Sequence, residues 1–281
     1  MKGTLYLVST PIGNLADLSH RAVEVLGTSD IIFAEDTRRT RILLDHYRIH
    51  PRDLRSYYQH NEASRSEEAR EILARGGSIA LASDSGTPLI SDPGFRLVRL
   101  AIDEGADVVP IPGASAALAA LVASGLESGA FTFLGFVPRS GRERREYIRS
   151  LKEMPRTAVM FESPRRLVQT LAELVDELGG GRRVAVAREL TKVHEEFTRG
   201  TLSEAAAYYK ENAPRGEVVI CLAAAEPAES EDLAAARRLA QEMAQAGSSS
   251  KEIVRALRDR YSLERNRAYA LALEAAEEGK S

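Results

Sequence analysis

Short runs of apolar residues alternate with amphipathic segments over the first 125 residues of the chain. The apolar runs are continuous, which is typical of strands buried on both faces of a sheet. They predict strands at residues 4–9, 31–34, 78–82 and 107–110. The amphipathic segments between them predict helices at residues 19–26, 38–47, 64–75, 95–104 and 114–124. This βαβ rhythm predicts an α/β domain with a mostly parallel sheet, for which we take residues 1–125.

A second series of apolar runs predicts strands at residues 131–136, 157–161, 183–188, 195–200 and 217–222. We therefore expect a second α/β domain over residues 126–226. The boundary is placed at residues 125–130, because small and polar residues are typical of a linker. A length of 281 residues also favours more than one domain.

The composition changes to alanine, glutamate and arginine after residue 226. Apolar residues recur at helical spacing over 233–243 and 253–261, and residues 265–278 predict a third helix. Ser249 and Glu252 have the spacing of a capping box at the start of the second helix. We expect a helical module over residues 227–281 that resembles a helix-turn-helix. A packing or docking role is the alternative to a nucleic-acid contact.

Charge and cysteine content exclude several classes of protein. A net charge of -3 and a pI of about 6.1 argue against a surface coated in positive charge, so any nucleic-acid contact must come from local patches. Cys221 is the only cysteine, which rules out a disulfide within the chain and fits a reducing compartment. No apolar stretch approaches membrane-spanning length, and residues 1–9 lack the pattern of an export signal. We expect a cytoplasmic protein that is not bound to a membrane.

Metal chemistry has little support in the sequence. The chain has five histidines, of which His46 and His50 alone stand at helical spacing, and we interpret these two as surface residues. We expect no metal site.

Three loops follow predicted strands of the first domain, so their ends should meet at one edge of the sheet. The first, residues 9–15, lacks the glycine pattern of dinucleotide-binding loops and the Walker lysine. The second, residues 82–94, is dense in turn-forming residues; Asp84 could accept a bond from an amine or a ribose hydroxyl, whereas we interpret Asp92 as a cap of the next helix. The third, residues 110–116, leads into a helix of small residues. Together they predict a ligand site.

Seven motifs occur in a fixed order: residues 9–15 (STPIGNL), 34–38 (AEDTR), 60–62 (HNE), 83–94 (SDSGTPLISDPG), 112–115 (PGAS), 161–166 (FESPRR) and 188–192 (RELTK). Each motif is weak alone, but their joint presence is specific. Through them the chain resembles, over nearly its whole length, the ribosomal RNA small subunit methyltransferase I family of the tetrapyrrole methylases.

The resemblance implies that S-adenosyl-L-methionine (AdoMet) binds in a cleft between the two α/β domains. It further implies methylation of a ribose 2'-hydroxyl on a decoding-centre cytidine of small-subunit ribosomal RNA, and a homodimer. The cofactor contacts carried over from the first domain are Pro11, Ile12, Asp84, Thr87, Ser115 and Ala116. Those carried over from the second domain are Phe161, Glu162, Ala187, Arg188, Glu189, Leu190, Gly216, Glu217 and Val218.

Methyl transfer from AdoMet needs no metal or covalent nucleophile, because the sulfonium carries its own leaving group. A ribose hydroxyl is a weak acid, so a positioned base would assist the reaction. The candidates are Glu35, Asp36, Glu62, Glu162, Glu189 and Lys192. We choose Glu62 as the catalytic base or orienting group, with Lys192 next. Capping is the alternative reading for Glu35 and Asp36, and a cap or structural acceptor is the alternative for Glu62.

Arginines cluster at residues 38–41, 139–149 and 165–166 and predict a local phosphate-binding surface. The RNA contacts that we expect are Arg38, Arg139, Arg142 and Arg165. Glu143 and Glu146 leave a solvated charged helix as the alternative.

Two other functions stay open at this stage: a tetrapyrrole methyltransferase, since arginine also binds tetrapyrrole carboxylates, and a non-catalytic RNA-binding ribosome-assembly factor. The loop chemistry at Asp84, Ser115 and Ala116 speaks against the assembly factor.

Overall fold

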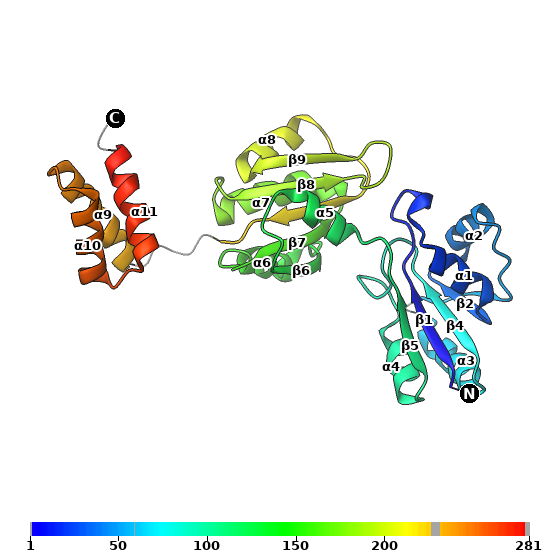
Figure 1. The fold of residues 1–281 in the computed structure, drawn as a ribbon. Helices are drawn as coiled ribbons and strands as arrows, with labels where there is room; N and C mark the ends of the chain where they lie inside the picture. Colours follow the sequence, from blue (N-terminus) through cyan, green and yellow to red (C-terminus); the bar gives the residue numbers. More distant parts are fainter. Residues whose placement is uncertain (1, 59, 226–230, 279–281) are drawn as a thin grey trace. The chain divides into compact units, whose positions relative to one another are not determined.

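The structure is a computed structural model that describes residues 2–58, 60–225 and 231–278 (Figure 1). The chain divides into two compact units, Met1–Ala225 and Glu226–Ser281. The larger unit holds two five-stranded sheets with their helices, and the smaller unit is helical. The predicted α/β class with a helical C-terminal segment is confirmed. None of the helices in the described ranges has the length and apolar character needed to cross a membrane.

The first sheet has the strand order β3-β2-β4-β1-β5. Its strands are β1 (Thr4–Val8), β2 (Ile31–Ala34), β3 (Leu54–Ser56), β4 (Ser78–Ala82) and β5 (Asp107–Ile111). Every pairing in this sheet is parallel, as predicted. The sequence analysis missed β3, because this strand has only three residues and two of them are polar.

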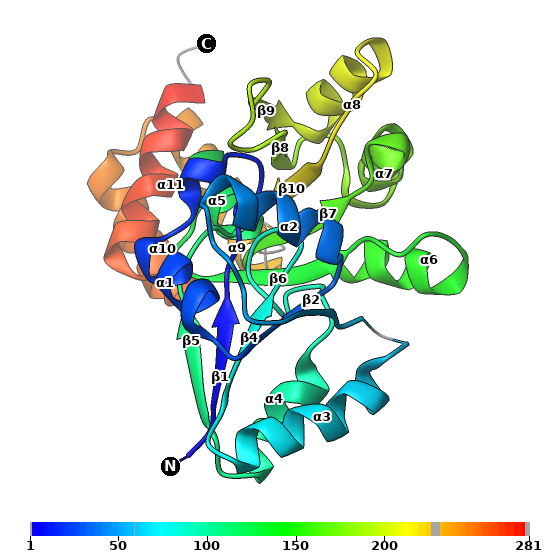
Figure 2. The same cartoon turned by 90° about the vertical axis from the view of Figure 1, so that its right-hand side faces the viewer.

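Helices cover both faces of the first sheet (Figure 2). On one face, α1 (His20–Thr28) and α2 (Thr37–His46) pack on alternate residues of the strands. On the other face lie α3 (Glu62–Ala74) and α4 (Phe95–Asp103). A short 3-10 helix, η1 (Leu15–Asp17), precedes α1. Two-sided burial explains why the strands are continuously apolar.

The second sheet has the order β6-β7-β10-β8-β9 and is mixed. Its strands are β6 (Phe131–Phe136), β7 (Thr157–Glu162), β8 (Arg183–Arg188), β9 (Glu196–Thr201) and β10 (Val218–Leu222). β6 and β7 run parallel, whereas β7, β10, β8 and β9 pair antiparallel in that order. One face is covered by α6 (Gly141–Ser150), α7 (Pro164–Leu178) and α8 (Leu202–Glu211).

The opposite face of the second sheet is covered by α5 (Ala116–Ser124), which directly follows the last strand of the first sheet. Ala117, Ala120 and Leu121 are buried in one cluster with residues of β7, β8 and β10. Ile12, from the loop after β1, belongs to the same cluster. By packing, α5 is therefore part of the second half of the unit. We still propose three domains, at residues 1–125, 126–226 and 227–281. Helix α5 then belongs to the first domain in sequence but packs in the hydrophobic core of the second domain.

The smaller unit consists of α9 (Glu231–Gln245), α10 (Ser250–Tyr261) and α11 (Arg265–Glu278). Its core is formed by Ala236, Ala240, Ile253, Leu257, Ala268, Leu271, Ala272 and Ala275. The predicted capping box is confirmed: the Ser249 hydroxyl accepts a bond from the Glu252 N–H, and the Glu252 carboxylate accepts one from the Ser249 N–H.

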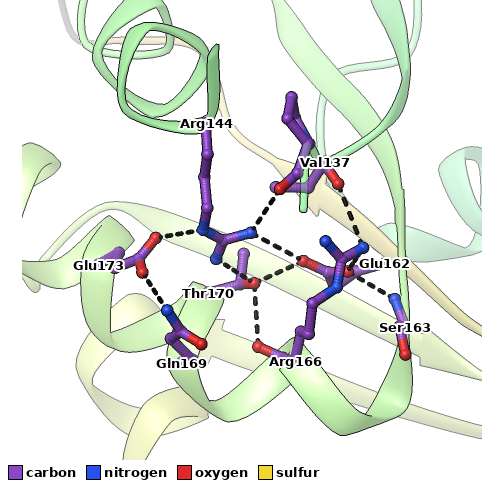
Figure 3. Close-up of polar contacts among 9 residues, drawn as sticks. Val137, Arg144, Glu162, Ser163, Arg166, Gln169, Thr170 and Glu173 are labelled. Carbon is purple, nitrogen blue, oxygen red and sulfur yellow. Dashed lines mark hydrogen bonds and ion pairs between the residues drawn. The ribbon is translucent and has the colours of Figure 1, made fainter. Parts of the chain in front are cut away.

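A buried ionic network joins β7 to α6 and α7 (Figure 3). The Glu162 side chain is fully buried, and its carboxylate lies 2.6 Å from Nη2 of Arg166 and 3.6 Å from Nη1 of Arg144. It also accepts bonds from the Thr170 hydroxyl and the Ser163 N–H, both 2.6 Å long. Arg144 bonds further to Glu173 at 2.8 Å. The inclusion of Arg144 in a phosphate-binding cluster is wrong, since its side chain is only 5% exposed.

We expect Arg144→Met to destabilise the larger unit strongly. The substitution leaves the buried Glu162 carboxylate with a single guanidinium partner, and breaking a buried pair costs about 3–5 kcal/mol. Arg142→Met is the matched control in the same helix, because Arg142 is 85% exposed and its one ion pair within the described residues is with Glu146; its effect should stay within about 0.5 kcal/mol. Urea unfolding followed by circular dichroism measures both. Equal unfolding midpoints for the two variants would contradict the structural role of Arg144.

Candidate active site

A cavity of about 370 Å³ lies in the larger unit and is lined by residues of both halves. The first half contributes the loops after β1, β4 and β5. The second half contributes the ends of β6 and β7, the turn after β8 and the beginning of β10. This volume lies in the range of small-molecule binding sites in proteins.

Hydrogen bonds hold the three loops of the first half together. Thr10 and Gly86 exchange two backbone bonds of 2.9 and 3.0 Å, and the Thr87 hydroxyl donates to the carbonyl of Ala114 at 3.2 Å. Gly113 lies so close to Ser9 that a Cβ atom at position 113 would be 2.8 Å from the Ser9 Cβ. The predicted meeting of the three loops at one sheet edge is confirmed.

Most residues expected to contact the cofactor line this cavity. They are Ile12, Thr87, Ser115, Ala116, Phe161, Glu162, Leu190, Gly216, Glu217 and Val218. Pro11, Asp84, Ala187, Arg188 and Glu189 do not line it. The structure thus brings together residues that lie more than 200 positions apart in the chain.

Three of the expected cofactor contacts that do not line the cavity have structural roles next to it. The Asp84 carboxylate accepts a 2.8 Å bond from the Asp36 N–H, which joins the loops after β4 and β2. Asp36 itself caps α2, as one of its two readings required. Ala187 is buried within β8, and Arg188 pairs with Glu196. These contacts favour a supporting role for Asp84, Ala187 and Arg188.

Lys192 and Glu189 form a second support behind the cavity wall. The Lys192 ammonium donates to Glu189 at 2.8 Å and to Glu217 at 3.0 Å. Burial lowers the pKa of Lys192, but the hydrogen bonds that its ammonium donates to these two carboxylates outweigh this effect, and the pKa is raised above its ordinary value. A lysine held in its charged form is unsuited to accept a proton. Its geometry favours orientation of Glu217, which lines the cavity.

Glu62 lies beside the N-terminus of α4 and is not among the cavity-lining residues. Its side chain is 11% exposed, and its carboxylate accepts a 3.0 Å bond from the Gly94 N–H and lies 3.8 Å from the Arg96 guanidinium. A carboxylate stabilises the unsatisfied N–H groups and positive dipole end of a helix. The contacts of Glu62 therefore favour the structural acceptor over the catalytic base.

Asp92 was predicted to cap the following helix, and this prediction is wrong. The N-cap of α4 is Gly94, which makes no side-chain capping bond, whereas Asp92 lines the cavity. Burial raises the pKa of the Asp92 carboxyl to about 7, and the negative charges of Glu35 and Asp84 add to the shift. This pKa lies far above that of an exposed aspartate, so the Asp92 carboxyl group can exchange a proton near neutral pH.

The sequence analysis also missed other lining residues: Ser85, Gly86, Ile90, Ser91, Phe136, Ser163, Pro164 and Val219. Most of them lie in or beside the sequence motifs that predicted the site, so their position in those motifs could have identified them. Phe136 had no such signal. Its ring lies edge-on to Phe161 with the ring centroids 5.3 Å apart, although it is 57% exposed. The pair gives the cavity an aromatic wall.

The arginines expected to contact RNA are all exposed. Arg38 bonds to Asp36, and Arg142 pairs with Glu146. Arg139 precedes α6, and Arg165 is the second residue of α7. These two helix starts lie close together, because Arg166 donates a 3.2 Å bond to the carbonyl of Val137.

Within the described part of the chain, no group of three or more histidine, cysteine, aspartate or glutamate side chains could hold a metal ion.

Comparisons with known proteins agree with this architecture. The family described as Tetrapyrrole (Corrin/Porphyrin) Methylases matches residues 4–206. Among solved structures, diphthine synthase has a TM-score of 0.60 at 17% identity, covering 79% of this chain and 90% of that one. Uroporphyrin-III C-methyl transferase from Thermus thermophilus, complexed with S-adenyl homocysteine, has a TM-score of 0.53 at 19% identity, covering 78% and 97%. At these identities the likeness concerns the fold alone.

Curated relatives are much more similar in sequence. A protein of Mesorhizobium japonicum is 51% identical over 227 residues, which are 80% of this chain and 77% of the relative. A protein of Escherichia coli is 42% identical over 275 residues, which are 97% and 96% of the two chains. Both are named Ribosomal RNA small subunit methyltransferase I. With this identity over nearly the full length, the chain belongs to the ribosomal RNA small subunit methyltransferase I family, which has the tetrapyrrole-methylase fold.

Proposed function

We propose that this protein transfers the methyl group of AdoMet to the ribose 2'-oxygen of a decoding-centre cytidine in small-subunit ribosomal RNA, position 1402 in the 16S convention. The observation that carries the proposal is the cavity, which is assembled from both α/β halves and lined by the family's motifs. The names of the relatives supply the substrate class.

The lining suits AdoMet in both shape and charge. Ile12, Leu190 and Phe161 offer apolar surface to a flat adenine ring, while the small side chains of Ser115 and Ala116 let a ligand approach the backbone. Glu217 brings a carboxylate to the same cavity, which favours a ligand that carries a sulfonium and an ammonium. When bound, AdoMet supplies the methyl group together with its leaving group.

The residues of this chain contribute position and water exclusion. Holding the ribose oxygen in line with the methyl carbon can lower the barrier by roughly 7–11 kcal/mol at the well-oriented limit. The bonds among the three loops and the buried network around Glu162 keep opposite walls of the cavity in place. Lys192 holds Glu217 at the wall, and Glu62 anchors the start of α4.

For the RNA, we propose Arg38, Arg139, Arg142 and Arg165 as phosphate contacts. Arg139 and Arg165 are the best supported of these contacts, since both are exposed next to β6 and β7, whose ends line the cavity.

The partner is the small ribosomal subunit or its RNA, and we propose a cytoplasmic homodimer as the working form. Methylation of a tetrapyrrole is the rival reaction, because the structural neighbours include such enzymes. The identity of 42% or more to relatives named for ribosomal RNA favours RNA.

Unmodified small ribosomal subunits should accept labelled methyl groups from AdoMet, and the label should map to a 2'-O-methylcytidine. Free small-subunit RNA and a tetrapyrrole precursor are run in parallel as competing substrates. Labelling of the tetrapyrrole alone, or of a base instead of a ribose, would overturn the substrate that we propose. AdoMet binding without transfer to any of the three would favour a non-catalytic factor.

Reversing charge at Arg139 and Arg142 together should weaken use of the ribosomal substrate and leave AdoMet affinity unchanged. Loss of two phosphate contacts lowers the slope of log affinity against log salt by about two. The matched control is the double variant Arg75→Glu and Arg99→Glu, which makes the same charge change at two exposed positions, one directly after α3 and one in α4. KM for small subunits, measured over a salt series, separates the two. The same salt slope for both double variants would remove the RNA role of the loop before α6.

A further inference from the structure

Three acidic residues are among those that line the cavity: Asp92, Glu162 and Glu217. Glu162 is bound by two arginines, a threonine hydroxyl and a backbone N–H, so its oxygens are fully used. Glu217 accepts a 3.0 Å bond from the Lys192 ammonium, so its carboxylate is already engaged in an ion pair. Two of the three carboxylates are therefore engaged in holding the wall.

Asp92 differs from both, because its side chain has no hydrogen bond or ion pair to any other residue in the described ranges. The loop that carries it is nonetheless firmly held. Gly86 bonds to Thr10 at one end, and Gly94 donates to Glu62 at the other. Leu89 and Ser91 have positive φ angles of 70° and 69°, a backbone conformation that residues other than glycine adopt at an energetic cost. Surrounding contacts thus hold Asp92, whose carboxyl group is unpartnered in the described ranges, in the cavity lining.

The electrostatic surroundings of Asp92 make its carboxylate a stronger base than an exposed one. A second, smaller pocket is lined by Asp92 together with Glu35 and Tyr57. Burial is the main cause that raises the pKa of Asp92 to about 7, followed by the charges of Glu35 and Asp84. Other charged groups of the described residues that act on this pocket are Asp36, Arg39, which lies 3.9 Å from Asp84, and the Glu62–Arg96 pair. A general base works best when its pKa lies near the working pH.

We propose that Asp92 is the catalytic residue that accepts the proton of the attacking ribose 2'-hydroxyl. This inference rests on the proposed function. The O–H bond breaks and its proton passes to the Asp92 carboxylate, while the ribose oxygen forms a bond to the methyl carbon. The bond between that carbon and the AdoMet sulfur breaks, and its electron pair stays on sulfur, which leaves S-adenosylhomocysteine. Asp92 then releases the proton to water, so the reaction yields one methyl ether and one proton.

Asp92→Asn should lower kcat for small ribosomal subunits by about 100-fold or more, the usual contribution of a general base. The affinity for AdoMet, measured by calorimetry, should change less than about twofold, because the amide keeps the shape of the carboxyl. Asp103→Asn makes the same change on α4 at a side chain that is 65% exposed, and it should have no effect. An unchanged kcat in Asp92→Asn would refute the assignment. A parallel loss of AdoMet affinity and kcat would refute it too, since Asp92 would then hold the methyl donor.

The pH profile gives a readout that a merely structural role would not move. For the wild type, kcat/KM should rise with pH with a midpoint near the Asp92 pKa of about 7. Glu35→Gln removes a negative charge that raises this pKa, so the midpoint should move to lower pH while the rate at high pH is kept. Asp92→Asn should lose this limb of the profile. A midpoint that is the same in Glu35→Gln and the wild type would contradict the proposal. Inactivity of the wild type itself on small subunits would instead refute the proposed function.

A stability measurement separates loss of a base from loss of the fold. The folded state raises the pKa of Asp92, so its contribution to stability is present at low pH and is lost as pH rises through about 7. Asp92→Asn removes this ionisation. Its melting temperature should therefore exceed that of the wild type above neutral pH, with a smaller difference at about pH 5. A variant that melts below the wild type at high pH would show that Asp92 is a structural group.

Discussion

The paired backbone bonds between Thr10 and Gly86 are the contact on which the cavity depends. They join the loops after β1 and β4, two adjacent parallel strands, at the point where the strands end. Parallel pairing places such loops at one edge of a sheet, and the bonds then fix their spacing. The third loop is attached through Thr87 and Ala114. From this frame follow the positions of Ile12, Ser115 and Asp92.

The opposite wall is held by a different kind of interaction. Glu162 ends β7 inside a network of charged side chains, and replacing such a group leaves an uncompensated buried charge. The hydrophobic cluster around α5 and Ile12 links this wall to the first sheet. Backbone bonds on one side and ion pairs on the other give two rigid surfaces, between which a nucleoside-sized ligand can be aligned. Alignment is the main requirement of methyl transfer from a sulfonium.

Much of this architecture could be predicted from the sequence, because burial on both faces makes the parallel strands continuously apolar and turn-forming residues mark the loops. Ten of the fifteen cofactor contacts that the family resemblance implied line the cavity. The strand β3 escaped prediction, since it is short and partly polar. The packing of α5 on the second sheet and the contact of Phe136 with Phe161 depend on tertiary structure, which has no local signature.

Charged residues were the hardest to interpret, because their role depends on partners distant in the chain. Arg144 stands among exposed arginines in the sequence but is buried against Glu162. Glu62 was predicted to act in the active site and Asp92 to cap a helix, but the structure shows the reverse arrangement. Glu62 bonds to the start of α4, and Asp92 lines the cavity. A helical period or a cap pattern cannot distinguish these cases, since both residues stand near predicted helix starts.

The crossing of the chain at residues 112–115 also has a mechanical meaning. β5 belongs to the first sheet and α5 packs on the second, so this short segment is the first covalent link between the two halves. Any rotation of one half against the other changes the backbone dihedral angles of these residues, as in a hinge. Ser115 also lines the cavity. A ligand that contacts Ser115 would therefore also contact the segment that joins the two halves.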